Sequence, residues 1–152
     1  MSNFIDPKDY DASIHREILS SLLREKGAGG QPNPLYDPAV VETCEDRSIA
    51  EMRSYLSKTY DCDAIFSARG AERHQLILMY ALDIAIYHIF CLHNPYKIAD
   101  IRKERYERAT DWLESVAQGK LSIEGAPRRS EEEVVENSPW QIVADKVRPT
   151  IM

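Results

Sequence analysis

Apolar residues occupy almost every position from Leu76 to Leu92, interrupted near the middle by Asp83 and His88. A helix that is apolar on nearly all sides is buried in a core or in a membrane. We expect this helix to run from near Ala71 to Asn94-Pro95, because proline disfavours a helical conformation in the residue before it. The apolar stretch is slightly shorter than the roughly 20 residues that span a bilayer. Together with its two polar residues, this favours a helix in the core or at a subunit contact, and no membrane association.

Charged and apolar residues alternate with a helical period over the next segment, roughly Ile98 to Gln118. Its predicted buried positions are Ile101, Tyr106, Ala109, Trp112, Leu113 and Val116. Gly119 follows directly, where a helix C-terminus prefers glycine. The two segments therefore predict a helical hairpin.

Two further helices are predicted closer to the N-terminus. The first covers about Asp11 to Lys26, with Asp11 as its cap and one apolar face formed by Ile14, Ile18, Leu19, Leu22 and Leu23. A loop rich in glycine and proline follows, from Gly27 to Pro34. The second starts at Asp37-Pro38, a capping residue followed by proline. Its buried stripe is Val41, Cys44, Met52, Tyr55 and Leu56, interrupted by Ser48.

The rest of the chain is predicted to be less regular. We expect Asp61 to Gly70 to form a loop with Phe66 turned inward. After Ser122 a charge run, Arg128 to Glu133, is followed by a small apolar patch at Pro139 to Val143. Such a tail buries too little surface to fold alone. The prediction is an all-α protein of four to five helices, a helical-bundle domain over residues 1–122 and a charged, flexible C-terminal tail over residues 123–152.

Composition narrows the possible functions. The chain has 152 residues, of which 43% are hydrophobic, and this is enough for one domain with a core. Its net charge of -6 does not favour a protein that grips nucleic acid over a whole face. The N-terminus lacks the features of a signal peptide. The cysteines, Cys44, Cys62 and Cys91, share no CxxC spacing, so we expect free thiols in a reducing cytoplasm.

No catalytic motif stands out in the sequence. His88, Cys91, His93 and the more distant His74 are the best metal candidates, but they lack the spacing of a known zinc motif. A GxSxG elbow and a phosphate-binding GxxxxGK[ST] loop are both missing. We therefore expect no metal, no cofactor and no enzymatic activity. A small enzyme that uses His88 or Cys91 remains the least favoured hypothesis.

Charged residues in the hairpin admit two interpretations. Asp83 is either a tuned acid or, as we prefer, a structural group that is hydrogen-bonded, paired with an arginine such as Arg102 or Arg105, or exposed on a narrow polar edge. The basic stripe of Arg102, Arg105 and Arg108 is interleaved with Glu104 and Glu107. A salt-bridged solvated face is favoured for it, and contact with nucleic-acid phosphates is the alternative.

A known family shares the order and spacing of several short motifs. They are Phe4-Ile5, Tyr55-Leu56 with Tyr60-Asp61, Asp83-Ile84-Ala85 with Tyr87-His88-Ile89, Arg105 to Ala109, Trp112-Leu113 and Val116 to Ser122. With these motifs the chain resembles a family of small helical head–tail connector, or head completion, proteins of Mu-like phages and prophages. The resemblance covers roughly Phe4 to Ser122. Tyr106, Ala109, Trp112, Leu113 and Gly119 are the signature and packing residues that it implies.

The resemblance implies a structural virion protein that forms a ring of about twelve copies beneath the portal, with heterologous contacts between neighbouring subunits. The implied partners are the chain itself, portal and tail proteins, and DNA that passes through the channel without sequence-specific binding. The implied locations are the virion and, during assembly, the bacterial cytoplasm. In the tail, Trp140, Ile142 and Val143 are candidate partner-binding anchors. A nucleic-acid-binding accessory protein of a phage or mobile element, acting through Arg102, Arg105 and Arg108, is the alternative function.

Overall fold

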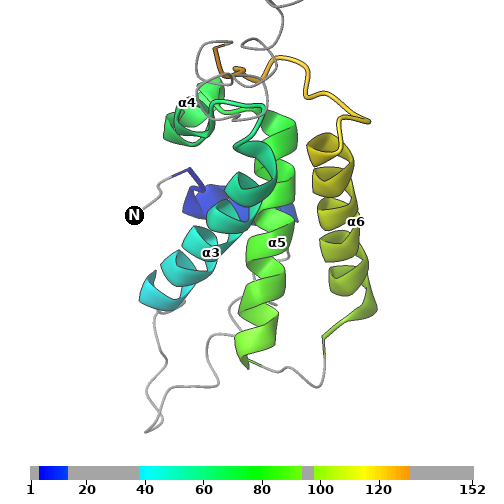
Figure 1. Ribbon diagram of the computed structural model, residues 1–152. Coiled ribbons are helices and arrows are strands. Elements are labelled where there is room, and N and C mark those ends of the chain that lie inside the picture. Colours follow the sequence, from blue (N-terminus) through cyan, green and yellow to red (C-terminus); the bar gives the residue numbers. More distant parts are fainter. Residues whose placement is uncertain (1–3, 14–37, 94–97, 131–152) are drawn as a thin grey trace, which may run out of the picture.

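The computed structural model describes residues 4–13, 38–93 and 98–130. Helices dominate this part of the chain, which confirms the predicted all-α class. Three long helices, α3 (Pro38–Leu56), α5 (Gln75–His93) and α6 (Asp100–Ala117), run side by side (Figure 1). The shorter elements are η1 (Pro7–Asp9), α1 (Tyr10–Ser13), α4 (Cys62–Ser67) and η2 (Gly70–Glu72).

Helix α5 is the centre of the molecule. Every residue from Tyr80 to Ile86 is buried. Because successive residues of an α-helix are turned by about 100°, seven consecutive buried positions mean that the helix is covered on all sides. In Figure 1 it lies between α3 and α6, with the N-terminal segment behind it. Within the described residues, one stretch, Gln75–Leu92, is long and apolar enough to cross a membrane, and 61% of it is buried inside the protein.

The contact between α3 and α5 includes Ser48, the residue that interrupts the predicted apolar stripe of α3. Ser48 is fully buried, and its hydroxyl donates to the Ala81 carbonyl oxygen at 2.7 Å. Val41, Cys44, Met52 and Leu56 are buried as predicted, whereas Tyr55 is only partly buried. A small hydroxyl side chain therefore belongs to the core here, because its polar atom has a backbone acceptor across the helix contact.

Several predicted boundaries are wrong. Asp11 lies inside α1, and the turn before α1 is stabilised instead by Asp9, whose carboxylate accepts from the Asp6 N–H at 2.7 Å. The predicted loop from Asp61 contains α4, which Asp61 caps by accepting from the Ala64 N–H at 3.1 Å. Phe66 is buried in α4, as expected. The predicted stripe residues Ile14 to Leu23 lie outside the described residues.

The boundaries of the hairpin differ less. Helix α5 begins at Gln75, since Ala71 belongs to η2, and it ends at His93, one residue before the predicted stop. Helix α6 ends at Ala117 and is soon followed by Gly119 at φ 78°, and the Lys120 N–H donates to the Ser115 carbonyl oxygen at 2.9 Å. This left-handed glycine is the helix stop that the sequence indicated. Ile101 was predicted to be buried but is 52% exposed.

Residues 119–130 return over the ends of the helices toward α4 (Figure 1). Ile123 is buried, and its N–H donates to the buried Tyr60 hydroxyl oxygen at 2.7 Å. The Asp61 N–H donates to the Pro127 carbonyl oxygen at 2.9 Å, and the Arg129 N–H to the Thr59 carbonyl oxygen at 3.1 Å. The described part of the predicted tail is therefore attached to the helices. The division at residue 122 as a domain boundary stays a prediction.

The N-terminal segment is fixed to the bundle by a buried carboxyl group. The Tyr10 hydroxyl donates to Glu45 Oε1 of α3 at 2.6 Å. Burial raises the pKa of Glu45 from 4.5 to about 7, although the Tyr10 bond acts in the opposite direction. The folded state therefore holds a proton on Glu45 at pH values where the unfolded state has lost it.

This difference predicts a pH-dependent stability. Between pH 4.5 and about 7 the folded state binds more protons than the unfolded state, so the free energy of unfolding should fall as the pH rises through this window. Glu45→Gln, which cannot ionise but can still accept from Tyr10, should remove this slope. It should also stabilise the protein by about 1–3 kcal/mol at pH 8. Urea unfolding at pH 4 and pH 8 measures both effects.

Tyr10→Phe is the matched control, because it keeps the carboxyl group and removes its hydrogen-bond donor. The slope between the two pH values should persist or become steeper in this variant. An unchanged pH slope in Glu45→Gln would contradict the assignment of the effect to Glu45.

Candidate functional site

The contact between α5 and α6 contains most of the residues that the sequence singled out. Two aromatic stacks join the helices, Tyr80 with Trp112 at a centroid distance of 4.6 Å and Tyr87 with Tyr106 at 4.0 Å. Ala109 and Leu113 are fully buried, each with 0% exposure. The hairpin that the sequence predicted is therefore a packed unit.

Asp83 lies within this contact as a buried carboxylate. Its side chain is 3% exposed, and Arg105 Nη1 and Arg108 Nη2 each lie 4.0 Å from one of its oxygens. Burial raises the pKa of Asp83, and the positive charges of Arg105, Arg108 and Arg102 partly offset this effect. Among the predicted alternatives, pairing with arginines describes Asp83 best.

Two arginines of the basic stripe, Arg105 and Arg108, therefore face an acid within the protein. Arg102 is partly buried, and burial, followed by repulsion from Arg105, lowers its pKa. The side chain of Arg105 is 34% exposed and that of Arg108 61% exposed. Glu104 and Glu107 are exposed. Since the stripe converges on Asp83, it is not simply a solvated face, and its availability to nucleic-acid phosphates is reduced. Contact of these arginines with nucleic-acid phosphates stays a prediction.

Glu51 connects all three long helices. From α3, its Oε1 accepts from the Tyr106 hydroxyl of α6 at 2.7 Å, and its Oε2 lies 3.2 Å from His88 Nε2 of α5. Burial and the bond to Glu51 raise the pKa of Tyr106. The sequence singled out His88 and Tyr106 but not Glu51, because a half-buried glutamate in the middle of a helix has no distinctive local pattern.

His74, another candidate residue for chemistry, also has a structural partner. His74 Nε2 donates to the Glu124 carbonyl oxygen at 2.7 Å, which holds the C-terminal segment. Cys44 and Cys62 are buried thiols, and burial raises the pKa of each. In the described ranges, no three His, Cys, Asp or Glu side chains gather in a way that could hold a metal ion. Trp140, Ile142 and Val143 lie outside the described residues.

Arg73 is a structural centre that the sequence did not reveal. Its guanidinium pairs with Asp9 and donates to the Phe4 carbonyl oxygen at 2.8 Å. Phe4 is fully buried and packs edge-on against Phe66 at 5.1 Å. The partners are more than 60 residues apart along the chain, so no local pattern could have identified this pairing.

Comparison with known protein families gives a match that spans nearly the whole chain. The family model described as "Bacteriophage Mu, Gp36" matches residues 5–139. A comparison with curated proteins gives no match.

The connection through Glu51 predicts a specific loss of stability. Tyr106→Phe keeps the stack on Tyr87 but removes the hydroxyl that donates to Glu51, leaving a partly buried carboxylate oxygen with one donor fewer. We expect the free energy of unfolding to fall by about 1–2 kcal/mol. Chemical denaturation at pH 7 measures this change.

Tyr87→Phe is the matched control, because it preserves the same stacked pair and leaves the Glu51 bond intact. It removes only the weaker bond between its own hydroxyl and Cys91, so the loss should be smaller than that of Tyr106→Phe. Equal losses in the two variants would contradict a specific contribution of the bond to Glu51.

Proposed function

The chain belongs to the bacteriophage Mu Gp36 family and is therefore a phage protein, and we propose that it is a head–tail connector of the virion. In this proposal it forms a ring, with about twelve copies, beneath the portal of a tailed phage. It assembles in the host cytoplasm and remains in the particle. The single observation that carries the proposal is the family match over residues 5–139, which includes every described helix.

The internal contacts of the bundle support a structural role. Charged groups near its centre serve to join helices: Asp83 faces arginines of α6, Glu51 joins α3 to α5 and α6, and Glu45 holds the N-terminal segment. A subunit of a ring must keep its shape while neighbours bind different faces of it. Such cross-connections suit a scaffold of this kind.

The exposed side of α6 is compatible with a channel for DNA. Its exposed charged residues comprise five acids and two bases, Asp100, Lys103, Glu104, Glu107, Arg108, Asp111 and Glu114. An acidic surface does not neutralise phosphates, so it would not hold a passing duplex. This surface supports passage of DNA over an accessory role in binding it.

The apolar residues of the C-terminal tail are proposed to anchor the subunit on its neighbours. We expect the double variant Ile142→Asp and Val143→Asp to fold but to fail in assembly, because it places charges where an apolar contact forms. Produced in the phage that encodes the chain, it should yield DNA-filled heads without tails. Electron microscopy of the particles measures the fraction of complete virions.

Gln141→Asp is the control, since it adds a charge to the same segment at a polar position, and it should leave complete virions. Complete virions from the double variant would contradict the anchoring role. Mass spectrometry of purified virions tests the larger proposal: a connector must be found there, and its absence from intact particles would contradict the assignment.

A further inference from the structure

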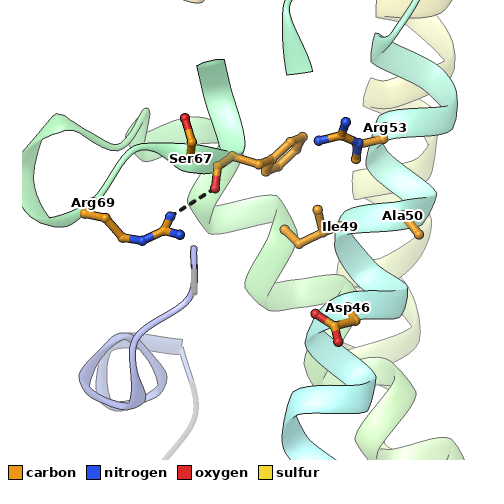
Figure 2. Close-up of a pocket in the computed structure, with 7 residues that line it drawn as sticks. Asp46, Ile49, Ala50, Arg53, Ser67 and Arg69 are labelled. Atoms are coloured by element: carbon orange, nitrogen blue, oxygen red, sulfur yellow. Dashed lines mark hydrogen bonds between the residues drawn. The ribbon is translucent and has the colours of Figure 1, made fainter. Parts of the chain in front are cut away.

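A surface hollow lies between α3 and α4, away from the contact of α5 with α6 (Figure 2). It has a volume of about 390 Å³ and is lined by Asp46, Ile49, Ala50, Arg53, Phe66, Ser67 and Arg69. Ile49 and Phe66 are buried core residues at 5% exposure each, so the hollow reaches the edge of the hydrophobic core. Ala50 and Ser67 are small and exposed, and they leave its mouth open.

Two arginines and one acid contribute charge to the lining of the hollow. Arg53 and Arg69 outnumber Asp46 among the lining residues. Arg53 pairs with the exposed Asp63, whereas Arg69 donates through Nη1 to two backbone carbonyl oxygens, those of Phe66 at 3.0 Å and Ala68. Within the described ranges Arg69 forms no ion pair with a carboxylate. An acidic segment with apolar side chains would complement both the charge and the apolar lining.

The C-terminal segment leads directly to this place. The Arg129 N–H donates to the Thr59 carbonyl oxygen, three residues after the end of α3. The charge of Arg129 contributes to lowering the pKa of Asp63, the ion-pair partner of Arg53, although hydrogen bonding by Arg53 is the larger cause. The last described residue, Ser130, therefore lies near the Arg53 side of the hollow.

We propose that residues Glu133-Val134-Val135-Glu136 of the same chain occupy this hollow. In an extended segment Val135 would cover Ile49 and Phe66, and the flanking glutamates would lie toward Arg53 and Arg69. Arg53 is six residues before Thr59, about 10 Å along a helix axis. Five extended residues after Ser130 span about 16 Å, so the segment can reach.

The family match favours this occupant over a foreign peptide. It extends to residue 139, so the segment belongs to the family's common part and not to an appended tail. The proposal concerns one isolated subunit and is independent of ring formation. Docking of residues 133–136 would fix the start of the remaining tail on the subunit. Trp140, Ile142 and Val143 would then be available for binding by a neighbouring subunit.

Disulfide formation in the full-length chain tests the proposal. Ala50→Cys is combined with Val135→Cys, in a Cys91→Ser background that removes the most exposed native thiol. A second pair, Ala50→Cys with Asn137→Cys, leaves both valines in place. The control pair combines Val135→Cys with Lys103→Cys, at an exposed position of α6. The rate of disulfide formation at low micromolar concentration is measured, with peptide mapping to identify the bond.

Both Ala50 pairs should cross-link within the monomer at least about tenfold faster than the control, because docking raises the effective concentration of the two thiols. Arg69→Glu should slow this reaction several-fold, and Arg47→Glu, an exposed arginine of α3 outside the hollow, should not. Rates equal to the control, or insensitivity to Arg69→Glu, would overturn the proposal. Cross-linking only between two chains would also overturn it, by assigning the hollow to a neighbouring copy. None of these results bears on whether the virion contains the protein.

Discussion

The fold depends on the need to cover one helix on every side. Helix α5 has no exposed face between Tyr80 and Ile86, so a single partner helix would leave apolar surface in water. Helices α3 and α6 cover two sides, and the N-terminal residues cover a third. This explains why a short segment around Phe4, far from α5 in sequence, is fixed so firmly by Arg73 and Tyr10. Without it, one side of the core would be open.

Apolar burial alone does not determine how the helices are aligned, and the polar groups at their contacts provide that information. The Ser48 hydroxyl reaches one particular carbonyl of α5, and Glu51 reaches one residue of α5 and one of α6. Sliding a helix by one turn would leave these groups buried without partners, which costs about 1–3 kcal/mol for each. Asp83 acts in the same way with its arginines, although burial disfavours its charge. These groups contribute more to a unique alignment than to total stability.

Features with a local cause could be predicted from the sequence. The apolar run gave the central helix, Gly119 gave the end of α6, and the phage family was recognisable from motifs that follow one another along the chain. Helix α4 was missed because six residues are too few to show a period, although Asp61 is a typical cap. Ile101 fitted the apolar period of α6 but lies in its first turn and remains exposed.

Features that depend on distant residues could not be predicted. The approach of Arg105 and Arg108 to Asp83 requires the packing of α6 on α5. Glu51 and Arg73 bind residues from distant parts of the chain. The sequence offered pairing with an arginine as one alternative for Asp83, and only the structure selects it. The attachment of residues 123–130 was hidden for the same reason, because Tyr60 and His74 are its partners.

Hydrogen exchange of the backbone amides of α5 tests the central claim most directly. If α5 is covered on all sides within the protein, the amides from Tyr80 to Ile86 should exchange only through global unfolding, with a protection that matches the free energy of unfolding. This should hold in aqueous buffer without lipid. Rapid exchange of these amides in the isolated chain, slowed only when lipid vesicles are added, would contradict the account.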